Sequence, residues 1–266
     1  MSPRVRPVAM LDSGLGGLTV LAALRSRSAR TDVVYFADTA NVPYGDRPLE
    51  EVAALGVRIS ERLVATHDPS MILIASGTTC AAFDRCGWPD VGTPLVGVIE
   101  AGARSAVRAT RTGSIGVIAT AGTIAGGSFE RALRTLKADA RVTNVPAPAL
   151  VPIVEAGESA SERAQLAVAA ACAPLIAGAC DAVILGCTHF PHLRRWFEAA
   201  LGPSVALVDP ADDCAADAVA LLPSRGGNAN FICEVSGDAP LFAQHALALG
   251  APRPASLTHV ELSLVT

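Results

Sequence analysis

A cysteine, a threonine and a histidine stand side by side at residues 187–189, shortly after the apolar run 182–185. Such a run is typical of a buried parallel strand, and open α/β sheets bind ligands where their strands end. A thiolate becomes accessible near neutral pH when a neighbouring cation lowers the cysteine pKa from about 8.5, and His189 could supply that cation. Cys187 is therefore a candidate base or nucleophile, with Thr188 as a donor to an anion. The alternative is a small buried cysteine that only packs behind a strand.

A glycine-rich segment, 12–17, follows another apolar run at residues 8–11. Its glycines let the backbone approach a ligand closely, and a helix that begins after them favours an anion. The hydroxyl of Ser13 is a further donor there. Asp12 could be an acid/base partner or an ammonium ligand, and it could equally be a helix cap. The glycine spacing differs from the dinucleotide-binding fingerprint.

Hydroxyl side chains follow two more apolar runs. Ser76, Gly77 and Thr78 come after residues 71–74, at the expected start of a helix. Thr120 and Thr123 hold the corresponding place in the second half of the chain. Hydroxyls and amides at helix starts suit an oxyanion, although helix capping explains the same residues.

The turn 43–46 and one glutamate complete the candidate site. The amides of Tyr44 and Gly45, with the Tyr44 hydroxyl, could hold a carboxylate, or the segment is only a turn. Glu155 could orient His189 or pair with an ammonium group, or lie solvated at a helix start. Together the candidates predict a small anionic substrate, a carboxylate or an amino acid.

Composition narrows the class of protein. The 266 residues are 51% hydrophobic and 17% charged, with a net charge of -4 and no long basic run. Nucleic acid is therefore not expected as a partner, and no apolar segment is long enough to span a membrane. Seven scattered cysteines without a CxxC pair indicate neither disulfides nor zinc, and favour a cytoplasmic location. We expect no metal, and the single lysine, Lys137, argues against a Schiff-base cofactor.

Short apolar runs alternate with Ala-rich helical stretches, which predicts an α/β fold with mostly parallel sheets. Strands are expected at 8–11, 33–36, 71–74, 95–99, 115–118, 182–185 and 231–235. Thr120 follows Asp12 by 108 residues, and Cys187 follows Ser76 by 111. These offsets predict an internal duplication, with two pseudo-symmetric domains facing each other across a cleft. We place the first domain at 1–98 plus 209–266 and the second at 99–208.

The motifs resemble those of the cofactor-independent glutamate racemases, in the aspartate/glutamate racemase superfamily. The resemblance covers nearly the whole chain and rests on 11–20 (LDSGLGGLTV), 35–39 (YFADT), 42–45 (VPYG), 116–123 (GVIATAGT), 150–155 (LVPIVE) and 185–191 (LGCTHFP). It implies interconversion of L- and D-glutamate for peptidoglycan biosynthesis, with one cysteine per domain acting as opposed bases on the α-carbon. The homodimer is a further expectation. The positions that match the family's substrate contacts are Asp12, Ser13, Tyr44, Gly45, Thr78, Thr120, Thr123, Thr188 and His189, and Asp12, Glu155 and His189 match the residues that assist the thiols.

This chain departs from the family's first catalytic motif, Ala-Cys-Asn-Thr. It has Ser76 where the family has the first thiol and Gly77 where the family has a substrate-binding Asn. A hydroxyl is a far weaker acid than a thiol, and racemisation needs proton transfer on both faces of the α-carbon. Cys80, one helical turn on, could replace the missing thiol, although packing against the sheet is the favoured interpretation.

Three functions remain open from the sequence. The first is a glutamate racemase in which Cys187 serves one face and Ser76 or Cys80 the other. The second is a single-cysteine relative, a lyase or isomerase similar to arylmalonate decarboxylases. The third is a non-catalytic protein that binds a carboxylate.

Overall fold

A computed structural model, which describes residues 5–222 and 227–262, contains two sheets of parallel strands. The first has the strand order β10-β9-β2-β1-β3-β4 and the second β6-β5-β7-β8. The strands are β1 (Val8–Asp12), β2 (Val33–Ala37), β3 (Met71–Ile74), β4 (Leu95–Gly97), β5 (Ser114–Ala119), β6 (Arg141–Pro146), β7 (Ala182–Leu185), β8 (Ala206–Val208), β9 (Phe231–Val235) and β10 (Ser256–His259).

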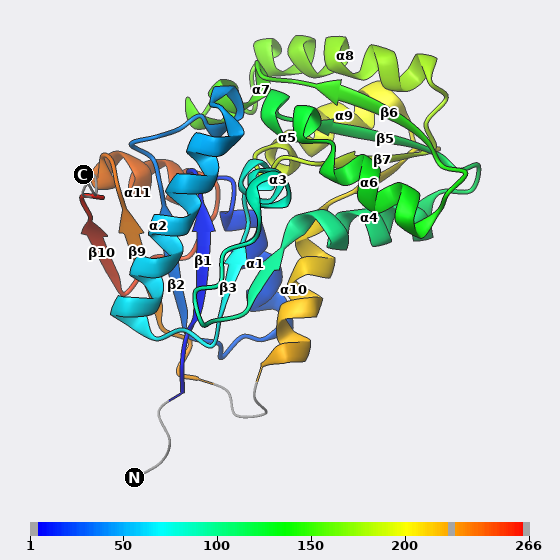
Figure 1. The fold of residues 1–266 in the computed structure, drawn as a ribbon. Helices are drawn as coiled ribbons and strands as arrows, with labels where there is room; N and C mark the ends of the chain where they lie inside the picture. Colours follow the sequence, from blue (N-terminus) through cyan, green and yellow to red (C-terminus); the bar gives the residue numbers. More distant parts are fainter. Residues whose placement is uncertain (1–4, 223–226, 263–266) are drawn as a thin grey trace.

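Helices connect the strands and cover both faces of each sheet (Figure 1). They are α1 (Leu18–Arg27), α2 (Leu49–His67), α3 (Gly77–Cys86), α4 (Val98–Ala109), α5 (Ala121–Gly126), α6 (Ser128–Leu136), α7 (Leu150–Glu155), α8 (Glu162–Ala177), α9 (Arg194–Leu201), α10 (Pro210–Leu221) and α11 (Ala239–Ala248), with 3-10 turns η1 (Tyr44–Asp46) and η2 (Phe190–Leu193).

The central strands are continuous apolar runs because helices bury them on both faces. β1, β2, β3, β5 and β7 are buried throughout. The α/β prediction with mostly parallel sheets is confirmed. One expected strand was too long, since β4 ends at Gly97 and Val98 already begins α4. The edge strands β6, β8 and β10 were not anticipated, because half-exposed edges carry a mixed pattern instead of an apolar run.

The two sheets repeat one connectivity. β1 lies between β2 and β3, and β4 follows beyond β3; in the same way β5 lies between β6 and β7, and β8 follows beyond β7. The strand that ends at Asp12 therefore corresponds to the strand before Thr120, and the strand before Ser76 to the strand before Cys187. Both offsets in the sequence reflect this repeated arrangement.

The chain crosses between the sheets twice. α4 leads from β4 to the second sheet, and α10 leads back from β8, packing against both α4 and α1 (Figure 1). We therefore keep 1–98 with 209–266, and 99–208, as the proposed domain limits; their parts at 1–4, 223–226 and 263–266 lie outside the described residues. Within the described ranges, no helix is both long and apolar enough to cross a membrane.

Candidate active site

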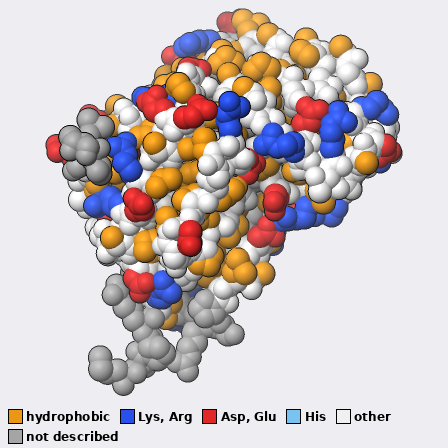
Figure 2. Space-filling view, viewed as in Figure 1, with side chains coloured by type: hydrophobic (Ala, Val, Ile, Leu, Met, Phe, Trp, Pro, Cys, Tyr) orange, Lys and Arg blue, Asp and Glu red, His pale blue; other side chains and the backbone are white. Residues whose placement is uncertain are grey.

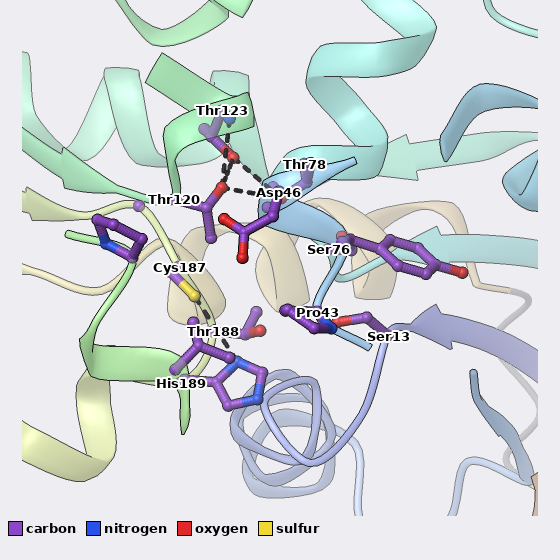
Figure 3. A pocket seen from close by; sticks show the side chains of 16 residues that line it. Ser13, Pro43, Asp46, Ser76, Thr78, Thr120, Thr123, Cys187, Thr188 and His189 are labelled. Carbon is purple, nitrogen blue, oxygen red and sulfur yellow. Dashed lines mark hydrogen bonds between the residues drawn. The ribbon is translucent and has the colours of Figure 1, made fainter. Parts of the chain in front are cut away.

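The carboxyl ends of the central strands of both sheets surround one cavity (Figure 3). Eleven of the residues singled out in the sequence line it: Ser13, Tyr44, Gly45, Ser76, Gly77, Thr78, Thr120, Thr123, Cys187, Thr188 and His189. The cavity volume is about 20 Å³. That is room for about one water molecule.

A hydrogen-bonded line of three side chains lies in the second half of the protein: Cys187, His189 and Glu155. The Cys187 sulfur lies 3.6 Å from Nδ1 of His189, whose Nε2 lies 2.5 Å from Oε1 of Glu155. The 3-10 turn η2 begins after His189, while Glu155 ends α7, so two separate elements aim these groups at each other. Glu155 also accepts a hydrogen bond of 3.2 Å from the amide of Leu15 in the first half.

This line holds a positive charge beside the sulfur. Burial lowers the pKa of His189, but its hydrogen bonds with Cys187 and Glu155 and their negative charges outweigh burial, so the pKa is raised well above 6.5. Burial raises the pKa of Glu155, but the hydrogen bond and charge of His189 outweigh it and lower that pKa below 4.5. The imidazolium donates from Nε2 to Glu155 and from Nδ1 to the sulfur. An imidazolium in this place stabilises negative charge on Cys187.

Asp12 lies beneath the cavity wall and does not line it. Its side chain is fully buried, and Oδ2 accepts hydrogen bonds from the amides of Gly14 and Gly17, both at 3.0 Å. Oδ1 accepts from the Thr188 hydroxyl at 3.3 Å across the two halves. Burial raises the pKa of Asp12, although the charge of His189 and these amides oppose the shift. Asp12 is not the cap of α1, which is Gly17.

Three threonine hydroxyls meet on another wall of the cavity. Thr78 lies 2.9 Å from Thr120 and 3.3 Å from Thr123, and the latter two are 2.8 Å apart. Thr78 lies in the first turn of α3 in the first half of the protein, whereas Thr120 caps α5 in the second half. These donors, together with the amides at the start of α3, suit a carboxylate.

Ser76 caps α3 and lacks the kind of support that Cys187 has. Its Oγ accepts a hydrogen bond of 3.2 Å from the amide of Thr79. Cys80 does not replace a thiol in the cavity, because it is fully buried and its Sγ donates to the Ile74 carbonyl at 3.4 Å. Burial raises the Cys80 pKa far above 9.0. Packing against the sheet was the correct interpretation, and Cys187 is the one described cysteine that lines the cavity.

Gly77 allows a close approach between the halves. A Cβ atom there would lie 2.8 Å from the carbonyl oxygen of Gly186, at the end of β7. Backbone cannot yield as a flexible side chain can, so a side chain at this position requires one of the two segments to shift.

Tyr44 lines the cavity, but its hydroxyl is already used. It donates to the buried carboxylate of Asp38 at 2.5 Å, and Ser236 donates to the same carboxylate at 2.6 Å. The expectation that this hydroxyl holds a substrate carboxylate therefore has no support. Asp38 instead links the turn that contains Tyr44 to Ser236, which directly follows β9.

Sequence reasoning missed five lining residues. Pro43 and Asp46 were visible only as parts of a turn signature, Val151 and Gly186 only as members of the motifs 150–155 and 185–191, and no signal distinguished Pro148. In the described part of the chain, no group of three or more His, Cys, Asp and Glu side chains could hold a metal ion.

On the face shown in Figure 2, Lys and Arg side chains lie among Asp and Glu side chains.

Comparison with known proteins gives consistent matches. Residues 19–218 match the family described as Asp/Glu/Hydantoin racemase. A glutamate racemase from Desulforudis audaxviator (strain MP104C) is 42% identical over 204 residues, which are 77% of this chain and 74% of that protein.

Two solved structures extend the similarity to the fold. Glutamate racemase isoform RacE1 from Bacillus anthracis has a TM-score of 0.91 and 29% identity, over 97% of this chain and 98% of that one. Glutamate racemase from Thermus thermophilus, solved with β-chloro-D-alanine, has a TM-score of 0.81 and 33% identity, over 97% of each chain.

Proposed function

We propose that this chain, which belongs to the Asp/Glu/hydantoin racemase family, interconverts L- and D-glutamate by proton transfer at the α-carbon. The observation that carries the mechanism is the line of Cys187, His189 and Glu155 beside a cavity that Ser76 also lines. The reaction uses no cofactor.

Cys187 is proposed as the base and acid for one face of the α-carbon. Its thiolate takes the α-proton, and the electron pair of the broken C–H bond moves into the substrate's α-carboxylate. His189 supports the thiolate as an imidazolium, and Glu155 keeps the imidazole charged and oriented. The Thr78, Thr120 and Thr123 hydroxyls are proposed to bind a substrate carboxylate, with Ser13, Thr188 and the amides of Gly45 and Gly77 as further contacts.

Ser76 is proposed to serve the other face. Its hydroxyl donates a proton to the carbanion, and the alkoxide that remains recovers a proton from water. The reverse step requires Ser76 to act as a base, which a hydroxyl does poorly. Racemisation is therefore slow, and the enantiomer whose α-hydrogen faces Cys187 exchanges that hydrogen faster than it inverts.

Proton NMR in deuterated water tests this function. D- and L-glutamate are incubated separately, and loss of the α-proton signal is compared with inversion measured by circular dichroism. Exchange of one enantiomer that outruns its inversion supports the proposal. Absence of both exchange and inversion, for both enantiomers, refutes it.

The presence of one cysteine in the cavity also favours a second candidate, a single-thiol lyase or isomerase in which Cys187 only donates a proton. Arylmalonate substrates added to the same NMR experiment distinguish this candidate by loss of a carboxyl group. We further propose a cytoplasmic homodimer that supplies D-glutamate for peptidoglycan. Rescue of a D-glutamate auxotroph and analytical ultracentrifugation test these two points.

A further inference from the structure

One carboxylate side chain reaches the cavity. Of the described residues that line it, Asp46 is the only Asp or Glu. It ends the 3-10 turn η1 and is exposed, and Figure 3 shows its carboxylate pointing into the cavity. The sequence motifs gave Asp46 no role beyond a turn.

The two carboxylates expected to serve the site are engaged elsewhere. Asp12 is buried behind the wall, where its oxygens accept from the amides of Gly14 and Gly17 and from Thr188. Glu155 is held by His189. Neither of these carboxylates lines the cavity.

The cation nearest to Asp46 in sequence is turned away from it. Arg47 donates from Nε to the Asn41 carbonyl at 2.7 Å and forms an ion pair with Glu51. Among the ion pairs formed within residues 5–222 and 227–262, none includes Asp46. Its negative charge is therefore available to a ligand.

We propose that Asp46 binds the ammonium group of an amino-acid substrate and thereby selects amino acids over carboxylic acids that lack this group. An ammonium ion that leaves water for a partly closed cavity must gain an anionic partner, and charge-assisted hydrogen bonds are the strongest available. The hydroxyls of Thr78 and Thr120, which lie beside Asp46 in Figure 3, suit the carboxylate of the same ligand. This inference rests on the proposed function, whose substrate is an amino acid.

Calorimetric titration with D-glutamate, L-glutamate and glutarate tests the inference. Glutarate keeps both carboxylates of glutamate and lacks the ammonium group. We expect the wild-type protein to bind at least one glutamate enantiomer about tenfold more tightly than glutarate. Asp46→Asn should weaken glutamate binding by about tenfold to a hundredfold and leave glutarate binding unchanged or tighter. In turnover, the same variant should raise KM with little change in kcat.

Glu50→Gln is the matched control. It removes an exposed carboxylate four residues away that pairs with Arg85 and does not line the cavity, and it should change neither affinity. Unchanged glutamate affinity in Asp46→Asn overturns the inference. Tighter binding of both ligands also overturns it, because Asp46 would then only repel the substrate carboxylates.

The two proposals fail in distinguishable ways. If the wild-type protein prefers glutamate, loses that preference in Asp46→Asn and yet catalyses no exchange, the proposed function fails and the inference stands. If glutamate is racemised but Asp46→Asn keeps the preference, the inference alone fails. Absence of saturable glutamate binding to the wild-type protein overturns both.

Discussion

Replacement of Ser76 by Cys should accelerate racemisation. Ser76 lines the same cavity as Cys187, at the end of the corresponding strand of the first sheet. A serine hydroxyl is a far weaker acid than a thiol, whose free pKa is about 8.5. The substitution therefore makes the group at this position far more acidic. Since a well-placed general acid or base contributes about 10²–10⁴-fold, inversion of glutamate should rise by at least about 10²-fold.

The same substitution should lower stability slightly. The Ser76 Oγ caps α3 through a hydrogen bond of 3.2 Å from the Thr79 amide. A sulfur atom accepts such a bond weakly, so the loss should be about 1 kcal/mol, or a decrease in Tm of about 2–4 °C for a chain of this size. Ser161→Cys is the matched control, because Ser161 caps α8 in the same way, at 3.1 Å from the Ala164 amide, and does not line the cavity.

Circular dichroism of solutions of each glutamate enantiomer measures inversion, and calorimetric melting measures the stability that is lost with the helix cap. We expect both variants to lose similar stability and only Ser76→Cys to gain activity. Inversion by Ser76→Cys at the wild-type rate, in a protein that melts as expected, would show that position 76 does not deliver the second proton. The two-face mechanism would then be refuted.

Three further predictions concern neighbouring residues. Cys187→Ala should reduce α-proton exchange at least about 10³-fold in the NMR assay, because no other described thiol lines the cavity. The stabilising contribution of His189 should be complete below pH 6.5 and lost as pH rises through its raised folded-state pKa, while that of Glu155 is lost on acidification below 4.5. The difference in Tm between wild type and His189→Asn should therefore be largest between about pH 4.5 and pH 6.5. Gly77→Asn, added to the cysteine variant, should lower its gain, because a Cβ would meet the Gly186 carbonyl at 2.8 Å; equal kcat values for the single and double variants would contradict this contact.

Much of the fold could be read from local patterns. Central strands buried on both faces must be apolar along their length, so 71–74 and 182–185 were predicted at their observed limits. The spacing from Ser76 to Cys187 indicated the duplication, because a repeated connectivity keeps equivalent strand ends at nearly constant separation. The edge strand β6 was missed because it is only partly buried and therefore lacks a continuous apolar run.

The sequence by itself determined which residue types stand at the strand ends, since a reactive side chain after an apolar run is a local property. Tertiary structure alone decided what each side chain touches. Glu155 and His189 are 34 residues apart in the chain, and their separation of 2.5 Å depends on how α7 packs beside η2. Packing also buried Cys80 against the sheet, gave the Tyr44 hydroxyl to Asp38, and left Asp46 as the carboxylate that faces the cavity. These outcomes depend on contacts between distant segments, which no local spacing encodes.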